Sequence, residues 1–406
     1  MKTKLVSLVI CTSCIPASLL ALGIRVPDQD AYAIARGNAF VATADNPSAI
    51  YYNPAGITQL EGLQSRLGAY TISLGSEYTS PEGFQVETRE RIQPVPYIYS
   101  TYSLKNLPLT LGFGSYSPYG LSLEWPEYSG FRTLARKGQI TYINFNLVAA
   151  WKITDSLSIA AGPTINYSRA ELIRGIAFAG DEFKFKGDDT DVAFNAGILW
   201  HPLEKHSFGV SYLSATAMNY DGHADTRLTV PRLIAFSEPA TARFHFPQRI
   251  IAGWSFRPTP DWNLEFNADW TDWDSVDTVT LRKATGNVAL PFNWTSSLLY
   301  EFGATRCLPH DWRVSAGYIY SENSVPDRSF NPSVPDSDRH ILSVGVGGKY
   351  KRLNWDAAYQ FAYGPTRTVT GGPVQPNPFV PGLKESADGQ YEFTSHAFTF
   401  SIGFSF

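Results

Sequence analysis

The strongest constraint on this chain is a two-residue alternation of apolar and polar side chains that recurs along most of its length. From residue 398 to residue 406, every even position is apolar and every odd position is small or polar. Residues 263–270 repeat the rule, with apolar side chains at the even positions and Asn, Glu or Asp at the odd ones. Successive side chains of a β-strand point to opposite faces, so this period predicts strands with one apolar face. We therefore expect an all-β structure from about residue 67 onward.

The lengths of the connections indicate which kind of sheet these strands form. We predict about fourteen strands, joined alternately by short links such as Lys105-Asn106 and by long loops. Short turns at one end and long loops at the other are typical of bacterial outer-membrane barrels, and an ordinary soluble sandwich lacks this sidedness. We predict an antiparallel transmembrane β-barrel over residues 63–406. The predicted long loops are 78–93, 118–137, 172–187, 220–240, 275–292, 322–339 and 364–394.

Tryptophan placement and composition agree with a barrel in a membrane. Indole rings favour the headgroup zone, so the tryptophans beside the short links predict an aromatic girdle, with tryptophans of an ordinary core as the alternative. Only 17% of the residues are charged, and the net charge of −4 without a Lys/Arg cluster excludes a nucleic-acid-binding surface. No later segment has about 18 uninterrupted apolar residues, so we expect no membrane-spanning helix. The tryptophans are Trp151, Trp200, Trp262, Trp312 and Trp355.

The first residues have the pattern of an export signal. A basic start at residues 1–4 precedes an apolar run at 5–22, which predicts a secretory signal peptide over residues 1–23. Cleavage is expected after Gly23 or after Ala21. A retained membrane helix is the alternative, and the large Ile10 before Cys11 argues against a lipoprotein signal. Removal of the signal leaves Cys307 as the only cysteine, so we expect no intramolecular disulfide.

Residues 24–62 are Ala-rich and show little alternation. Here Asp or Asn side chains precede proline, which predicts helix starts with a side-chain cap and proline at the first helical position. Helices this short are unstable alone in water, so we expect them to lie in the barrel lumen as a hatch, with a periplasmic extension as the alternative. The residues concerned are Asp45 or Asn46 before Pro47, and Asn53 before Pro54, with Gly56 and Gly62 expected to break or end the turns.

An ordered set of motifs runs along the chain. One, in the segment expected to form the hatch, spans residues 44–56 and includes Asp45, Ser48, Asn53, Pro54, Ala55 and Gly56, and others lie at residues 117–121, 140–161, 268–273, 325–327 and 334–336. In this set the chain resembles the outer-membrane long-chain fatty acid and hydrocarbon transporter family. The resemblance implies a monomeric barrel that catches a hydrophobic ligand in an extracellular groove and releases it sideways through a kinked third strand. The terminal Phe406 resembles the aromatic signal that the barrel assembly machinery recognises.

Two sets of residues are candidates for contact with a ligand. The predicted third strand, 107–117, contains Gly112 and Gly114 and runs into Pro118, which permits a kink, although glycine is also common inside barrels. Apolar residues in two long loops are expected to form the ligand-capture groove, or else to pack on each other as a lid. These are Phe178, Phe183 and Phe185 in loop 172–187, and Leu228, Val230, Ile234 and Phe236 in loop 220–240.

Enzyme signatures are absent from the sequence. The seven histidines are scattered, and there is no HExxH pair, Cys/His metal spacing, GxSxG elbow or phosphate-binding glycine loop. We expect no enzymatic activity, no cofactor and no metal. Our hypothesis is passive uptake of hydrophobic small molecules across the outer membrane, with membrane lipid and the assembly machinery as partners. A general diffusion porin and a loop-mediated receptor or adhesin are the alternatives. Apolar pockets discriminate weakly among similar molecules, so the choice between fatty acids and aromatic hydrocarbons stays open.

Overall fold

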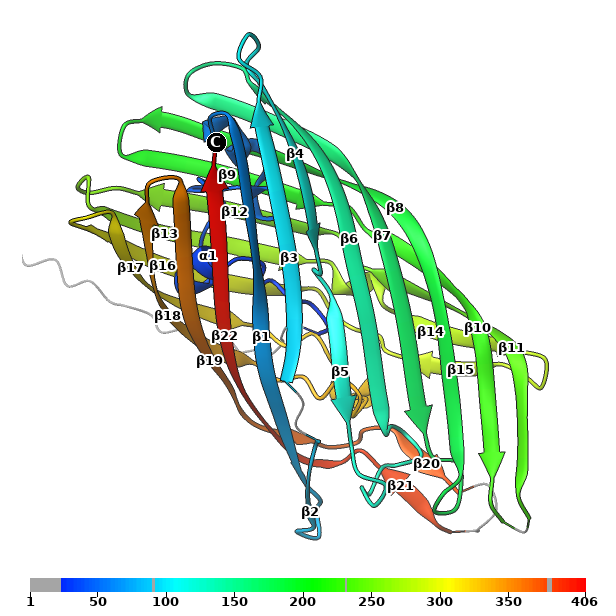
Figure 1. Ribbon diagram of the computed structural model, residues 1–406. Helices are drawn as coiled ribbons and strands as arrows, with labels where there is room; N and C mark the ends of the chain where they lie inside the picture. The colour runs from blue at the N-terminus through cyan, green and yellow to red at the C-terminus, as the bar shows by residue number, and fades with distance from the viewer. Residues whose placement is uncertain (1–22, 90–91, 231, 378–381) are drawn as a thin grey trace, which may run out of the picture.

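A closed antiparallel β-barrel surrounds a short helical segment (Figure 1). The computed structural model describes residues 23–89, 92–230, 232–377 and 382–406. The predicted signal peptide, except for Gly23, lies outside the described residues.

The first strand closes the barrel against the last. β1 (Leu63–Thr79) pairs with β22 (Gly389–Ser405) from Gln64 opposite Ser405 to Thr79 opposite Gln390. Closure is required in a membrane, because hydrocarbon offers no hydrogen-bond partner to the free backbone groups of a sheet edge. The predicted all-β barrel of 14 antiparallel strands is confirmed.

Some strands of the wall are continuous and others are interrupted midway. The continuous strands besides β1 and β22 are β3 (Ile92–Ser103), β6 (Lys137–Lys152), β7 (Leu157–Arg174), β8 (Glu182–Leu203), β17 (Trp312–Ser321), β18 (Arg339–Tyr350) and β19 (Leu353–Val369). The interrupted strands are β4 (Leu109–Tyr116) with β5 (Gly120–Glu124), β9 (His206–Leu213) with β10 (Thr216–Leu228), β11 (Ile234–Phe246) with β12 (Arg249–Phe256), β13 (Trp262–Thr271) with β14 (Thr278–Lys283), and β15 (Val288–Pro291) with β16 (Ser297–Leu308). The connections carry β2 (Gln85–Glu87), β20 (Val374–Pro376), β21 (Lys384–Ser386) and a 3-10 turn, η3 (Asp327–Ser329), and a second 3-10 turn, η2 (Trp273–Ser275), lies in the interruption between β13 and β14.

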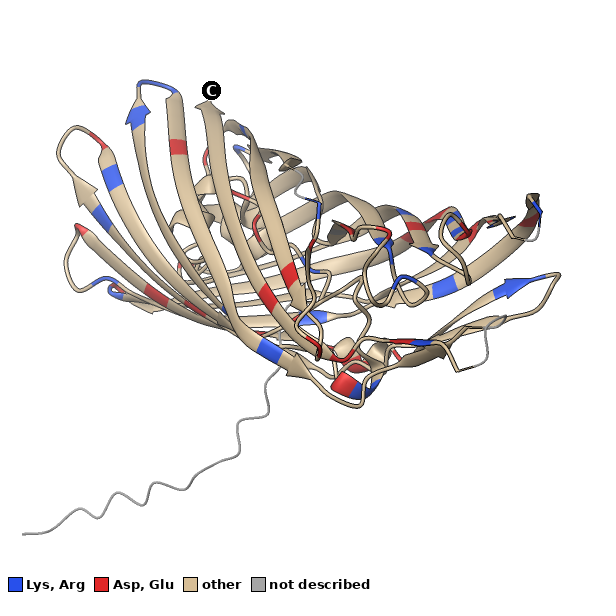
Figure 2. Cartoon of the chain, turned by 90° about the horizontal axis from the view of Figure 1, so that it is seen from below, with Lys and Arg blue, Asp and Glu red and all other residues tan. Residues whose placement is uncertain are grey.

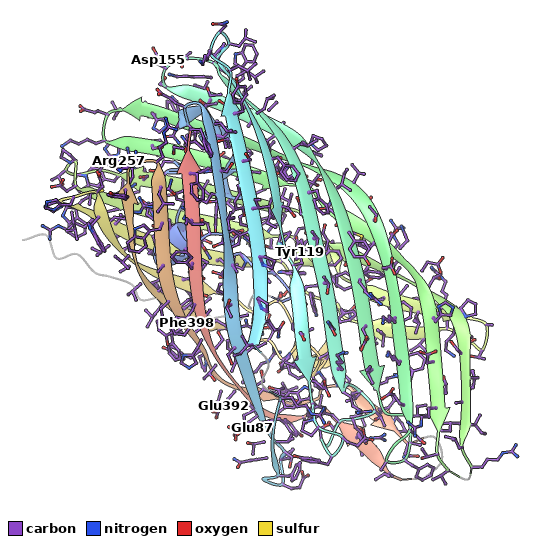
Figure 3. The ribbon with its side chains drawn as sticks, viewed as in Figure 1. Glu87, Tyr119, Asp155, Arg257, Glu392 and Phe398 are labelled. Carbon is purple, nitrogen blue, oxygen red and sulfur yellow. The ribbon has the colours of Figure 1, made fainter. Side chains whose placement is uncertain are left out.

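The two ends of the barrel differ in their connections. Short turns gather at one end together with the C-terminus, and Figure 3 shows Asp155 and Arg257 there, with Glu87 and Glu392 toward the other end. In outer-membrane barrels the short turns face the periplasm, so we name the two ends periplasmic and extracellular. The short turns are 104–108, 153–156, 204–205, 257–261, 309–311 and 351–352.

Several predicted long loops are wrong because the strands continue far beyond the expected limits. β7 ends at Arg174 and β8 begins at Glu182, so the connection is 175–181 instead of 172–187. Likewise β10 and β11 occupy most of 220–240 and leave 229–233. The prediction assigns Phe183 and Phe185 to a loop, whereas they alternate with Lys184 and Lys186 in β8 and are buried on its inner face.

In the regularly alternating stretches of the wall, the apolar face of the strand points outward and the polar face points into the lumen. In β22, Phe398 and Phe400 are 65% and 52% exposed, whereas Thr399 and Ser401 are buried. Figure 2 shows Lys, Arg, Asp and Glu at turns and loops and as separate bands on the strands, with long uncharged stretches of strand between them. Beside the short turns, Trp151, Trp200, Trp262 and Trp312 are exposed, as a girdle at the headgroup level requires.

The leading segment, which we define as residues 23–62, lies within the barrel near its periplasmic end (Figure 1). It contains α1 (Ala31–Ala35), α2 (Ala49–Tyr52) and η1 (Pro54–Gln59), whose apolar residues are buried. They share a hydrophobic cluster with inward residues of the wall such as Tyr99 and Val148. Among the described residues, no helix combines the length and the apolar character that crossing a membrane requires.

Candidate functional site

Buried ion pairs hold the leading segment in the lumen. The segment contributes two arginines and one aspartate to these pairs, and each of the three bonds an oppositely charged side chain of the wall. All six side chains are at most 2% exposed. Removing one partner of a buried pair typically costs 3–5 kcal/mol, because the other charge stays uncompensated. These pairs therefore oppose any movement of the segment out of the barrel as a unit. They are Arg25 with Asp269, Arg36 with Glu265, and Asp30 with Arg66.

Asn53 begins the last helical turn of the leading segment and ties it to the wall. Its Oδ1 accepts the N–H of Ala55 at 3.2 Å, and Pro54 follows at the first position of η1. Its Nδ2 donates to the carbonyls of Val41 at 2.8 Å and of Ile198 in β8 at 2.9 Å. One side chain thus caps η1, joins two parts of the segment and contacts the barrel.

The other residues of the same motif have different roles. Asn46 Oδ1 accepts hydrogen bonds from the Ser48 N–H at 2.8 Å and the Ser48 hydroxyl at 2.7 Å, which fixes the turn before α2, while Asp45 is exposed. The prediction of a side-chain cap with Pro47 at the first helical position is wrong, because α2 begins at Ala49 with Ser48 as its N-cap residue and without a side-chain cap bond. The prediction that Gly56 breaks or ends a turn is wrong. Gly56 lies inside η1, where the absence of a side chain allows contact with the backbone of Ala44.

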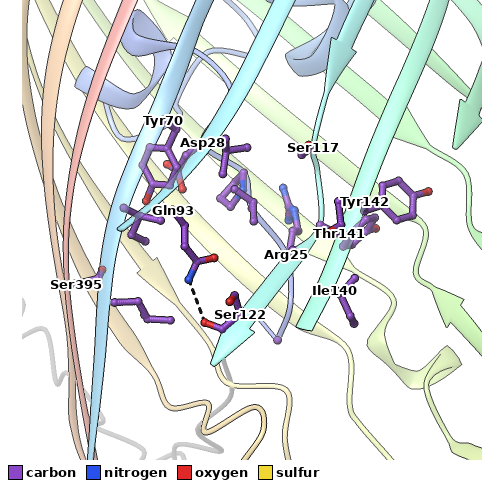
Figure 4. Close-up of a pocket in the computed structure, with 18 of the residues that line it drawn as sticks. Arg25, Asp28, Tyr70, Gln93, Ser117, Ser122, Ile140, Thr141, Tyr142 and Ser395 are labelled. Carbon is purple, nitrogen blue, oxygen red and sulfur yellow. Dashed lines mark hydrogen bonds between the residues drawn. The ribbon is translucent and has the colours of Figure 1, made fainter. Parts of the chain in front are cut away.

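The third strand of the wall is interrupted between β4 and β5. β3 pairs with β4 from Ile98 to Ser103, but the pairings of the described residues join β5 to β6 and not to β3. This leaves a lateral gap in the wall between the outer part of β3 and β5. From β3, Gln93 crosses the gap, since its Nε2 donates to the carbonyl of Ser122 at 3.0 Å (Figure 4). Nearer the extracellular end, Arg89 bonds Glu124 of β5 through its backbone N–H at 2.9 Å and its Nη1 at 2.6 Å.

The leading segment supplies the hydrogen bonds that the interruption would otherwise leave unmade. The N–H of Val26 donates to the Pro118 carbonyl at 2.8 Å, and the N–H of Gly120 donates to the Ile24 carbonyl at 2.9 Å. The Gln29 amide bonds both the carbonyl and the N–H of Ser117, at 2.8 and 3.2 Å. Residues 24–29 therefore stand in for a missing strand at the gap.

The glycines proposed for a kink lie elsewhere in the same strand. A Cβ added to Gly112 would approach Ile50 Cδ1 to 2.9 Å, and one added to Gly114 would approach Ile50 Cγ2 to 3.0 Å. Both glycines therefore make room for the leading segment. Pro118, in contrast, lies within the interruption itself.

A cavity of about 530 Å³ lies beside the leading segment at the lateral gap (Figure 4). Most of its lining is apolar, from β1, β3 and β6. Its polar groups include Arg25, Asp28 and Arg339, and Gln93 lies at its edge beside the gap. This combination suits a molecule with a long apolar body, with or without a polar group. We call this space the gap cavity.

A smaller and almost entirely apolar cavity of about 100 Å³ lies nearer the extracellular end, and we call it the upper cavity. Ile140 and Val334 line both cavities, so these two side chains separate them. The aromatic residues of its lining are Phe185, Tyr220, Phe244, Phe292 and Trp294.

The residues predicted for ligand capture lie mostly on one strand face. Phe183, Thr226 and Phe236 are opposite one another across β8, β10 and β11, and directly opposed residues share a face. Leu228 opposes Ile234 two positions farther toward the hairpin tip. Phe183 and Phe185 are buried, whereas Ile234 and Phe236 are 37% and 42% exposed. The two remaining predicted residues, Phe178 and Val230, lie in the connections 175–181 and 229–233.

These strand-face residues lie on the face that leads from the exposed hairpin to the upper cavity, because Phe185 lines that cavity, and Thr226 stands between Phe183 and Phe236 on this face. We name the face of Phe183, Phe185, Leu228, Ile234 and Phe236 the apolar track.

Asp181 joins the two connections at the head of the apolar track. Its carboxylate accepts the Thr229 hydroxyl at 2.7 Å and the Phe178 N–H at 3.1 Å, and its carbonyl accepts from Arg132 Nη2 at 2.9 Å. Burial raises the pKa of the Asp181 carboxyl, but the hydrogen bonds from Thr229 and Phe178 and the charge of Arg132 outweigh it and hold the pKa below its ordinary value. The carboxylate therefore stays ionised and keeps the connections together.

In the described part of the chain, no group of three or more His, Cys, Asp or Glu side chains could hold a metal ion. Cys307 is a free, exposed thiol away from both cavities.

Comparison with known proteins gives a consistent result along the whole chain. The model of a family described as outer membrane protein transport protein (OMPP1/FadL/TodX) matches residues 12–406. The long-chain fatty acid transport protein of Salmonella typhi is 21% identical over 376 residues, which cover 82% of this chain and 85% of that protein. The 47 kDa outer membrane protein of Pasteurella multocida is 23% identical over 362 residues, covering 80% and 83%.

Solved structures show the same fold. A Pseudomonas aeruginosa FadL homologue matches with a TM-score of 0.82 at 19% identity, covering 94% of this chain and 99% of that one. The Pseudomonas putida toluene transporter TodX matches with a TM-score of 0.75 at 14% identity, covering 96% and 100%.

We predict that Asp181→Ala loosens the two connections without opening the barrel. Amide hydrogen exchange in residues 175–181 and 229–233 should rise by about tenfold, because a charged hydrogen-bond acceptor is lost. Hydrogen exchange measured by mass spectrometry checks this, with Asp225→Ala, an exposed aspartate of β10, as the control. In the unsubstituted protein the link should persist at mildly acidic pH and weaken only below the ordinary Asp pKa of about 3.9, because the folded-state pKa is lowered. Unchanged exchange in the variant would show that the connections are ordered by other contacts.

Proposed function

The chain belongs to the outer membrane protein transport protein family (OMPP1/FadL/TodX), and from this premise we propose that it takes up hydrophobic small molecules along the apolar track and releases them through the lateral gap. Membership makes it an outer-membrane transport protein and not an enzyme. Long-chain fatty acids and aromatic hydrocarbons are the proposed substrate classes.

The observation that carries the lateral route is the contrast between a filled lumen and an incomplete wall. The leading segment fills the periplasmic half of the lumen with buried side chains and three buried ion pairs. The gap cavity, in contrast, lies where β5 has lost its pairing to β3. A straight path along the axis would require the segment to leave, whereas a sideways path requires a shorter rearrangement around residues 24–29.

We assign the leading segment after signal removal, residues 24–62, as the hatch, and residues 63–406 as the transmembrane barrel. Residues 1–23 are proposed to be the signal peptide. The capping contacts of Asn53, the buried position of Ser48 and the close contact of Gly56 support the hatch assignment, because they fix the segment in one arrangement.

The proposed route has three stages. An apolar molecule first lies on the apolar track, then enters the upper cavity, and then passes Ile140 and Val334 into the gap cavity. Apolar burial at each stage provides attraction without an energy source. The lateral gap then leads into the membrane, with Pro118 in the interruption marking the proposed gate.

The proposed partners follow from the same geometry. Membrane lipid surrounds the outward apolar face, and the exposed C-terminal Phe406 at the periplasmic end is available to the barrel assembly machinery. A monomer suffices for this function, because the cavities and the track belong to one chain.

The two alternatives are not favoured. A general diffusion porin needs an open aqueous lumen, but the polar inward residues of β13 contact the leading segment. A loop-mediated receptor or adhesin needs no internal cavities, and the comparisons match transport proteins along most of the chain.

The first prediction from the proposed function tests the substrate class. Binding of saturated carboxylic acids to the purified protein should tighten about fourfold in Kd per added CH₂, since burial of each contributes roughly 0.8 kcal/mol. Isothermal titration in detergent, corrected for partition of each acid into the micelles, checks this. Equal affinity for short and long acids would contradict uptake driven by apolar burial.

A second prediction concerns the bridge across the lateral gap. Gln93→Ala removes the hydrogen bond to Ser122 and should raise the rate of ligand release into liposome membranes severalfold, because a hydrogen bond contributes about 1 kcal/mol. A fluorescent fatty-acid release assay measures the rate, and Gln390→Ala on the exposed face of β22 is the control. Equal rates for the two variants would show that Gln93 does not restrain the gap.

The third prediction separates the hatch from the barrel. Asn53→Ala removes a helix cap worth about 1 kcal/mol and two bonds to carbonyls, so the hatch should loosen while the barrel stays closed. The heat-modifiable band of the folded protein on gels should persist, uptake should change, and single-channel conductance should rise above a negligible starting level. Large conductance of the unsubstituted protein would instead favour a porin, and loss of the folded band would assign Asn53 to barrel assembly.

A further inference from the structure

We infer that the leading segment also fastens the first strand of the barrel to the last, with Asp30 as the residue that holds both. This role concerns assembly and is independent of transport. It assigns a function to a buried carboxylate that lies away from the proposed ligand route.

The contacts of Asp30 lie at the seam where the barrel closes. Its carboxylate pairs with Arg66 of β1, with Arg66 Nη2 donating to Oδ1 at 3.0 Å. The Ser401 hydroxyl of β22 donates to Asp30 Oδ2 at 3.0 Å, and the N–H of Ala31 donates back to the Ser401 oxygen at 3.0 Å. β1 and β22 are the two strands whose pairing closes the barrel, so one carboxylate bonds both sides of the seam.

The same polar network continues into the neighbouring strands. Arg66 Nη2 also donates to Asp356 of β19 at 2.8 Å, and Arg313 of β17 donates to both oxygens of Asp356 at 2.9 and 2.7 Å. On the other side of the seam, the Tyr97 hydroxyl of β3 bonds the Ser401 hydroxyl at 2.8 Å. The network therefore extends from β3 across the seam to β17.

Charge balance links closure of the seam to docking of the leading segment. Within this network the wall supplies two guanidinium groups, Arg66 and Arg313, but one carboxylate, Asp356. Asp30 supplies the second carboxylate, and it is completely buried. A barrel closed without the segment would leave Arg66 without its carboxylate partner Asp30 and Ser401 without its acceptor on the segment, so the two bonds by which Asp30 links β1 to β22 would be lost.

The chain order makes this coupling possible. The leading segment ends at Gly62, directly before β1, so Asp30 is tethered close to Arg66 before the distant β22 arrives. Docking of Asp30 on Arg66 then presents a hydrogen-bond acceptor to Ser401, and the last strand completes the network.

The structure offers a closely matched control. Glu265 of β13 is also a buried carboxylate that joins the wall to the leading segment, through Arg36 and the N–H of Ala42. It lies away from the seam, in a strand that pairs with β12 and β16. Replacement of either acid by its amide removes one buried negative charge at the same interface.

The experiment compares Asp30→Asn with Glu265→Gln in the mature chain, refolded from urea into detergent micelles. The heat-modifiable gel band reports the closed barrel. We expect Asp30→Asn to lower the rate or yield of this band about tenfold relative to Glu265→Gln. Equal closure of the two variants would overturn the inference.

A disulfide between β1 and β22 distinguishes a role of Asp30 in closing the barrel from a general loss of stability. Thr71 and Phe398 oppose each other across β1 and β22, and Phe398 points outward. In a Cys307→Ser background, Thr71→Cys and Phe398→Cys can be joined by a disulfide before refolding. The disulfide should restore closure of Asp30→Asn to the level of the disulfide-joined parent, even if the unlinked variant does not fold at all. Failure of the disulfide to restore closure would overturn the inference as well.

Discussion

A backbone N–H or C=O group inside a bilayer has no water to bond, and this constraint governs the whole molecule. It requires β1 to pair with β22, so that the sheet has no edge. It also explains how the wall tolerates an interruption between β4 and β5. Backbone groups of residues 117–120 that have no strand partner at the interruption are bonded by residues 24–29 of the leading segment. These bonds come from the backbone of the segment and from the side chain of Gln29. The leading segment is therefore part of the wall as well as a filling of the lumen.

Much of the fold could be predicted from the sequence, because alternation reports which face of a strand is apolar. The regularity of residues 398–406 correctly places Phe398 and Phe400 on the lipid side. Strand ends were harder, because the alternation continues beyond the membrane. Phe183 and Phe185 look like loop contacts in the sequence, yet they belong to the inner face of β8, where apolar side chains face the lumen instead of lipid.

The site was only partly predictable. Asn53 has a local signal, an Asx side chain before proline, and its capping bond follows from that pair alone. The contacts of Arg25 and Asp30 have no such signal, because Arg25 meets Asp269 across 244 positions of sequence and Asp30 meets Arg66 across 36. The inward acids of residues 263–270 indicate ion pairs with the leading segment, because carboxylates inside a barrel need cations and the segment contains arginines. This pattern does not specify which arginine pairs with which acid.

The double use of residues 24–29 has a mechanical consequence. These residues belong both to the segment that fills the lumen and to the wall. They are hydrogen-bonded to the interrupted strand on one side and line the gap cavity on the other. In the proposed route, a shift of residues 24–29 that widens the gap cavity also breaks their hydrogen bonds to the interrupted strand. Entry into this cavity and lateral release would then be mechanically coupled.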